Sequence, residues 1–208
     1  MAKGVLEQAM IETTQENQFS LLNAVCQQGL QQAESVLAGM VAQPITLTAG
    51  DIRLIEVVRL QEALPKQYAE NISQVSMCFE GDVSGCMFIL FPAETTTVLI
   101  NTLTKSAMKS YEMDVFRIGT ITEVGNILLS GVIAAVVAAT GASLSYGVLD
   151  YDETTILVLS EHTREQRMLL GELMIQVAGL EVSVMVMGAF EAESLVQLNA
   201  LLSKGETS

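Results

Sequence analysis

The chain has 208 residues, long enough for one large domain or two small ones with a core that needs no disulfide or metal ion. Half of the residues are hydrophobic, 16 % are charged and Trp is absent, which indicates a globular chain and excludes an intrinsically disordered one. A formal net charge of −14 argues against nucleic acid or an anionic membrane surface as a partner, and permits a protein with a basic face.

The first half is predicted to begin with helices and to continue with strands. Pro44 ends an amphipathic helical pattern, and Gly81-Asp82 is typical of the tight turn of a β-hairpin. The expected elements are an exposed leading helix at 5–17, a long helix at 19–43, a strand at 45–49, an extended stretch at 52–60, a hairpin at 72–91 and a helix at 93–103.

The second half is predicted to repeat that order. A polar connector at 104–112 precedes it, and the period-two alternation of LEVSVMVM indicates a strand. The expected elements are a long helix at 114–140, a strand at 143–149, a turn at 150–153, a strand at 154–160, a hairpin at 168–190 that turns near Gly179, and a short helix at 192–202.

The two halves match in pattern, not in identity, with a period of roughly one hundred residues. We therefore expect an α/β (α+β) fold with pseudo-twofold symmetry, in which two long helices pack on a shared, mostly antiparallel sheet. In this interpretation residues 1–18 form a leading helical segment, and residues 19–208 form a single domain of two pseudo-repeats, at about 19–105 and 113–203.

The run from Val124 to Leu149 has no charged residue and is long enough for a membrane span. Its Ser and Gly breaks, and the absence of a flanking Lys or Arg cluster, favour a buried core helix followed by a buried strand. The N-terminal stretch lacks the apolar core of a signal peptide. We therefore expect no membrane insertion and a cytoplasmic location.

The chain has three cysteines, Cys26, Cys78 and Cys86, with no CxxC spacing, and one histidine, His162. This set predicts neither a zinc site nor a disulfide scaffold, so we expect reduced, buried thiols. His162 is expected in an exposed loop, and no Ser-His-Asp arrangement or nucleotide-binding motif is recognisable.

Glu123 and Asn126 begin the apolar part of the second long helix. Three residues apart on a helix, their side chains lie on one face about one turn apart. Taken alone the pair is ordinary, because a Glu near a helix start is favoured by the helix dipole.

The segment around the pair, Glu123-Val124-Gly125-Asn126-Ile127, resembles the signature helix of the CheC/CheX family of chemotaxis phosphatases. The hairpin FEGDVSGCMFILFP is also similar to a strand-turn-strand of that family, and the resemblance extends from about Phe19 to Leu202. It implies a protein that binds a phosphorylated CheY-type response regulator and accelerates hydrolysis of its phospho-aspartate.

The same resemblance assigns the chemistry. Asn126 would position a water in line with the phosphorus, and Glu123 would pair with a basic side chain of the regulator. No cofactor of its own is implied, because the magnesium ion belongs to the regulator. The family also includes members that bind the deamidase CheD, which is a possible second partner.

Two positions depart from the family pattern. Gly119 stands where Asp or Ser is usual, and Leu149 stands where Pro is usual. In the first half, alignment by distance to the following strand places Asn23 and Cys26 at the Glu and Asn positions and Ala49 at the Pro position, so the first site is interpreted as lost. The alternative function is a non-catalytic binding module or adaptor resembling the middle domain of FliM. The sequence does not predict the oligomeric state.

Overall fold

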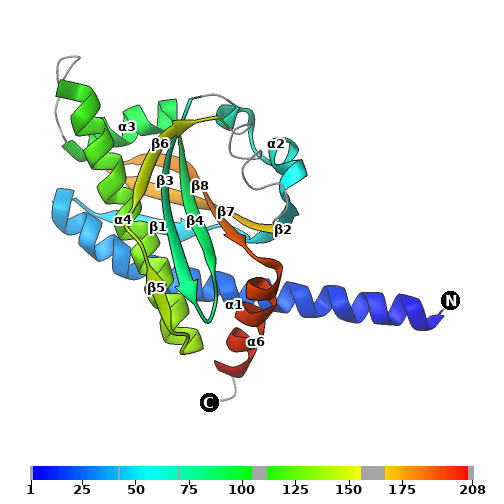
Figure 1. Ribbon diagram of the computed structural model, residues 1–208. Coiled ribbons are helices and arrows are strands. Elements are labelled where there is room, and N and C mark those ends of the chain that lie inside the picture. The colour runs from blue at the N-terminus through cyan, green and yellow to red at the C-terminus, as the bar shows by residue number, and fades with distance from the viewer. Residues whose placement is uncertain (1, 42, 70, 105–111, 156–166, 206–208) are drawn as a thin grey trace.

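The computed structural model describes residues 2–41, 43–69, 71–104, 112–155 and 167–205 (Figure 1). An antiparallel eight-stranded sheet lies at the centre, and the long helices α1 and α4 cross on one of its faces. The elements are α1 (Ala2–Val41), β1 (Ile45–Ala49), β2 (Arg53–Glu56), η1 (Val57–Arg59), α2 (Leu60–Ala63), η2 (Lys66–Tyr68), β3 (Ile72–Gly81), β4 (Gly85–Pro92), α3 (Ala93–Thr104), α4 (Glu112–Thr140), β5 (Leu144–Tyr146), β6 (Asp150–Thr154), β7 (Arg167–Val177), β8 (Leu180–Phe190) and α6 (Ala192–Gly205).

The sheet is built by exchange between the two halves. Its order is β1-β7-β8-β4-β3-β5, with β2 also on β7 and β6 also on β3. The hairpins β3–β4 and β7–β8 therefore meet at the β4–β8 pair, and each accepts the first two strands of the other half on its outer side. This arrangement confirms the predicted pseudo-twofold fold with two long helices on a mostly antiparallel sheet.

Two glycines allow α1 and α4 to cross closely. A Cβ atom added to Gly29 would lie 2.4 Å from the Gly131 carbonyl oxygen, and one added to Gly131 would lie 2.8 Å from the Gly29 carbonyl oxygen. Ala33 and Ala135, one turn further along each helix, flank the crossing in the same way. Only small residues permit this backbone contact, so both helices can bury their apolar faces against the sheet.

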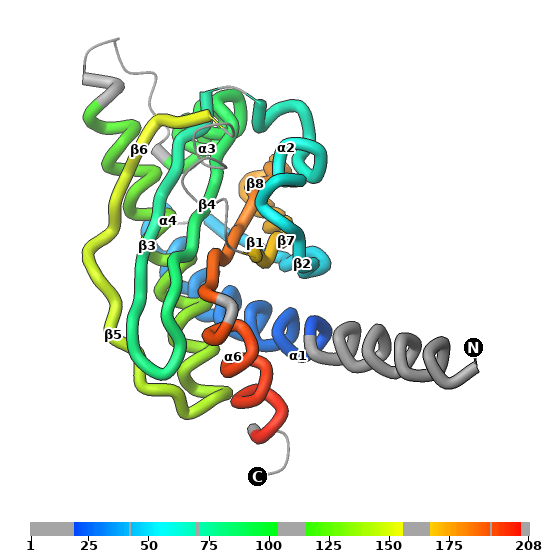
Figure 2. Tube along the Cα trace, turned by 45° about the vertical axis from the view of Figure 1, so that its right-hand side comes forward, coloured from blue at the N-terminus to red at the C-terminus, as the bar shows by residue number. Residues whose placement is uncertain are grey.

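The sheet is covered on both faces. The larger core joins α1, α3, α4 and α6 to one face and includes Leu30, Val75, Leu128 and Leu173. The segment 57–68 covers part of the other face, where Tyr68, Leu90 and Met187 are buried. Figure 2 shows this segment on the side of the sheet away from α4.

Several predicted elements are corrected. The separate helices expected at 5–17 and 19–43 are one helix, α1, because no Pro or Gly interrupts the chain between them. The turn expected at 150–153 is strand β6, in which Tyr151 is half-buried and its neighbours Asp150 and Asp152 are exposed. The stretch expected at 52–60 is extended only over β2. Thr104 and Glu112, the two ends of the connector expected at 104–112, belong to α3 and α4. The rest of that connector, most of the strand expected at 154–160, and His162 lie outside the described residues.

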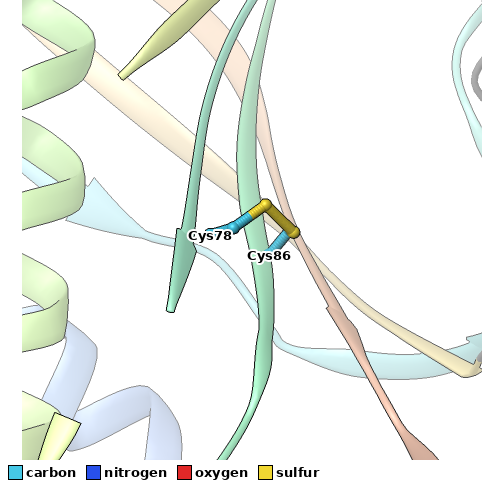
Figure 3. The surroundings of a disulfide bond; sticks show 2 residues. All are labelled: Cys78 and Cys86. Carbon is cyan, nitrogen blue, oxygen red and sulfur yellow. A yellow bond between two sulfur atoms is a disulfide. The ribbon is translucent and has the colours of Figure 1, made fainter. Parts of the chain in front are cut away.

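The prediction of reduced, buried thiols is wrong for two of the three cysteines. Cys78 and Cys86 face each other on β3 and β4 and form a disulfide, and Cys78 is exposed (Figure 3). Their Cα atoms lie 3.9 Å apart, because the hairpin register places them directly opposite one another. Cys26 is a free thiol, as expected. Disulfides persist mainly in oxidising compartments, which argues against the expected cytoplasmic location.

Helix α4 is the one described helix whose length and composition would allow it to cross a membrane, over Val115–Thr140. In the fold it packs on α1, α6 and the strands β3 and β4. Its residues Ile121, Leu128 and Leu129 are fully buried by these neighbours. The helix ends at Thr140, where Gly141 adopts a positive φ of 66° that favours glycine.

Candidate functional site

Glu123 and Asn126 lie together on the outward face of α4. Glu123 is exposed and Asn126 is half-buried, whereas their neighbours Val124 and Gly125 are buried. The apolar residues between and beside the pair therefore face the core, and the two polar side chains remain accessible. The structure therefore places the two predicted side chains on the accessible face of a helix whose other face is buried.

Gly125 fixes how closely this part of α4 approaches the sheet. A Cβ atom added at Gly125 would lie 2.6 Å from Cγ1 of Val75 on strand β3. Because Val75 is itself fully buried, it has no room to move away. The glycine between Glu123 and Asn126 thus allows direct contact between helix and strand, and it fixes the height of both candidate residues above the sheet.

The Asn126 side chain is held by its own helix. Ser130, one turn further on, donates a hydrogen bond from Oγ to Asn126 Oδ1 at 3.2 Å. A carboxamide has two N–H donors and a second acceptor site on its oxygen. With one site on Oδ1 used, Asn126 keeps groups that can bind a water molecule.

The start of α4, before the pair, presents an open surface. Val115, Phe116 and Ile118 are exposed, and a Cβ atom added at Gly119 would have no neighbour within 4 Å. On one side of this surface Arg117 forms an ion pair with Glu153 of β6, and the Tyr151 hydroxyl donates a hydrogen bond to the same carboxylate at 3.1 Å. The ion pair ties the exposed start of α4 to the sheet.

Leu149, which stands where the family pattern usually has Pro, lies in an irregular part of the sheet edge. Phe79 of β3 faces Tyr146 and Ser76 faces Asp150, so the β5–β6 side carries one residue more than β3 between these pairs. This is a β-bulge, and in it Val148 is 94 % exposed while Leu149 is half-buried. A bulge can shape the chain here without a proline.

The described residues contain no group of three or more His, Cys, Asp or Glu side chains that could hold a metal ion. They do line an apolar, partly open cavity of about 100 Å³ between α1, α4 and the sheet, whose walls include Cys26, Leu30 and Val136. Burial there raises the pKa of the Cys26 thiol to about 12, so this cysteine is not a nucleophile at neutral pH.

The first half has no counterpart of the pair. The helix crossing aligns Gly29 with Gly131 and Ala33 with Ala135, both 102 residues apart, which places Leu21 and Ala24 opposite Glu123 and Asn126. The alignment that predicted Asn23 and Cys26 is therefore displaced by two residues. It was based on the distance to the next strand, but α1 continues twelve residues beyond Gly29, whereas α4 continues only nine beyond Gly131. Neither alignment provides a Glu/Asn pair.

The polar side chains of α1 instead bind the exposed edge of the sheet. Gln27 accepts a hydrogen bond from the Ala49 amide at 2.8 Å and donates one to the Leu47 carbonyl at 2.9 Å. Glu34 accepts one from the Leu47 amide at 2.6 Å, and Asn23 donates one to the Gly50 carbonyl at 3.0 Å. These three side chains bond to backbone groups of Leu47, Ala49 and Gly50 at the outer edge of the sheet, as a neighbouring strand would.

No family model matches the sequence, and no curated protein matches it at a significant level. Solved structures do match. FliY from Thermotoga maritima has a TM-score of 0.74 at 10 % identity, with 91 % of this chain and 97 % of FliY covered. The middle domain of FliM from Vibrio alginolyticus has a TM-score of 0.63 at 14 % identity, with 89 % and 99 % covered.

A third match is a CheX structure in complex with CheY, BeF3 and Mg²⁺ from Borrelia burgdorferi. It has a TM-score of 0.53 at 17 % identity, and covers 78 % of this chain and 95 % of that one. Identities this low establish a shared fold and nothing finer. The chain therefore has the fold of the CheC, CheX and FliM type, as its resemblance to that family implied.

Proposed function

We propose that this protein binds a phosphorylated CheY-type response regulator and accelerates the hydrolysis of its phospho-aspartate. The observation that carries the proposal is the placement of Glu123 and Asn126, which are accessible, one turn apart and on a helix fixed to the sheet by Gly125. The CheX neighbour of the same fold is seen bound to CheY, which makes a regulator of that type the natural partner to test.

The proposed reaction requires few chemical groups from this chain. An acyl phosphate is already labile, and the magnesium ion of the regulator stabilises the charge on its oxygens. Asn126 holds one water in line with the phosphorus, and such orientation alone lowers a barrier by several kcal/mol in favourable cases. Glu123 pairs with a cation of the regulator, and its charge-assisted hydrogen bond sets how the two proteins dock.

A second candidate is a binding module without catalysis. FliY and FliM superpose on the chain with higher TM-scores than CheX does. The first half also lacks the pair, so at most one site is present. In this alternative Glu123 still contributes to docking, but Asn126 has no effect on the lifetime of the phosphoryl group.

The test is the decay rate of a phosphorylated CheY-type regulator from the same organism, with and without the protein. We expect faster decay with the wild type and a loss of at least about tenfold in the acceleration for Asn126→Ala, with binding retained. Glu123→Ala should weaken binding about fivefold to tenfold. Gln197→Ala, an exposed amide on α6, is the matched control.

Two outcomes would reject catalysis. Decay unchanged by the wild type despite measurable binding would make the chain an adaptor, and acceleration that survives Asn126→Ala would remove Asn126 from the mechanism. A cytoplasmic location and an interaction with CheD belong to the same proposal. The exposed disulfide makes the location worth direct measurement, by fractionation and by trapping free thiols in cells.

A further inference from the structure

The hydroxyl group of Ser130 is bonded differently from other hydroxyl groups in the helices. Six of them donate to the backbone carbonyl four residues earlier, which is the usual bond of Ser and Thr inside a helix. These six are Thr96, Thr97, Thr102, Thr120, Thr140 and Ser203. Ser130 has a residue at the same distance, Asn126, but donates to its side chain.

We propose that Ser130 is a positioning residue that fixes the orientation of the Asn126 carboxamide for the hydrolysis of the acyl phosphate. This inference rests on the proposed function. A carboxamide free to rotate exchanges its oxygen and nitrogen, and only one orientation offers a given donor to a water. The bond from Ser130 holds Oδ1 on the Ser130 side and leaves Nδ2 as the group offered to the water.

The backbone below the amide is already fixed. Gly125 contacts Val75, and Leu128 and Leu129, which follow Asn126 on α4, are fully buried. The remaining freedom of Asn126 is therefore the rotation of its side chain. A single hydrogen bond from the next turn of the same helix removes that freedom without using a second element of the fold.

In the reaction, the water oxygen accepts a hydrogen bond from Nδ2 through one lone pair and attacks the phosphorus with the other. A bond forms between this oxygen and the phosphorus, and the bond from phosphorus to the aspartate oxygen breaks. The electron pair of the broken bond stays on the aspartate carboxylate, and both protons of the water are transferred to the released phosphate. Ser130 takes no part in these bond changes.

The first experiment measures kcat and KM for phosphorylated regulator with Ser130→Ala. Loss of one orienting hydrogen bond should lower kcat about fivefold to tenfold and leave KM within about twofold. Ser130→Thr, which keeps the hydroxyl, should restore kcat to within about twofold. Ser203→Ala removes a hydroxyl bonded to a helix carbonyl in α6 and is the matched control.

The second experiment observes the Asn126 side-chain amide by ¹⁵N–¹H NMR in the free protein. In Ser130→Ala its Nδ2 signals should shift and its hydrogen exchange with solvent should accelerate, while Ser203→Ala leaves both unchanged. Unchanged kcat together with unchanged amide signals in Ser130→Ala would overturn the inference while the proposed function stands. If the wild type fails to accelerate decay, the proposed function falls, and the amide signals still decide whether Ser130 holds Asn126.

Discussion

The two halves of the molecule use one packing unit for two purposes. In both, a long helix has a glycine at the point where the two helices cross, and it buries apolar side chains against the sheet. In the first half the polar side chains of the helix, Gln27 and Glu34, bond to the backbone of β1. In the second half Glu123 and Asn126 face outward. The first half therefore uses its polar helix residues to complete a sheet edge and has Leu21 and Ala24 opposite the pair, whereas the second half keeps a Glu and an Asn accessible to a partner.

The largest effect on stability should come from disrupting the helix crossing, which both halves share. Gly29→Val places a side chain against the Gly131 carbonyl, which belongs to the backbone and cannot move away. We expect the free energy of unfolding to fall by about 3 kcal/mol or more, measured by urea denaturation. Gly39→Ala on the same helix is the control, because its Cβ meets nothing within 4 Å, and it should not destabilise the protein.

The disulfide distinguishes the β3–β4 hairpin from β7–β8. Replacing Cys78 and Cys86 together by Ser removes a short cross-link from the unfolded chain, and should lower the free energy of unfolding by about 2–3 kcal/mol. Denaturation of the wild type with and without reductant should reproduce this difference. If the double variant and the reduced wild type both keep full stability, the cross-link does not stabilise the fold.

The hydrogen bonds from α1 side chains to the outer edge of β1 predict a smaller, local effect on stability. Gln27→Ala leaves the Ala49 amide and the Leu47 carbonyl without their side-chain partner, which should cost about 1–2 kcal/mol. Hydrogen exchange should accelerate at Ala49 more than at Leu47, because the Leu47 amide keeps its bond to Glu34. Uniform acceleration along β1 would show that Gln27 supports the whole strand.

The smallest expected effect is an increase in the free energy of unfolding. Gly119 is an exposed helical residue beside the candidate site, with open space around it. Gly119→Ala should therefore raise the free energy of unfolding by about 0.5–1 kcal/mol through helix propensity. Gly125→Ala, six residues along the same helix, should lower it, because its Cβ would overlap Val75. If both changes acted alike, the contact between helix and strand would not limit stability.

The sequence patterns predicted the long helices and both hairpins because those segments are rich in apolar residues and are bounded by Pro, Gly or polar turns. Strand β6 was missed because it lies at an edge, where four of its five side chains are polar and only one, Tyr151, is an aromatic residue that packs on the core. The disulfide could have been found. A hairpin that turns at residue 82 places residues 78 and 86 opposite each other, and both are Cys.

The candidate pair was recognisable from the resemblance of its segment to the CheC/CheX signature, but its supporting contacts were not. The hydrogen bond from Ser130 depends on a side-chain choice between Asn126 Oδ1 and a backbone carbonyl, which spacing does not reveal. The same holds for Gln27, whose spacing on α1 gives no sign that it bonds to β1. Long-range contacts of this kind are set by the packing of elements distant in sequence.

The exchange of strands between the halves has a consequence for how the molecule holds together. Strands β1 and β2 complete the sheet on β7, and β5 and β6 complete it on β3. Neither half can close its own hairpin edge, so the two must fold and unfold as one cooperative unit. A chain of half this length could build the same sheet only as a homodimer whose subunits lend each other their first two strands.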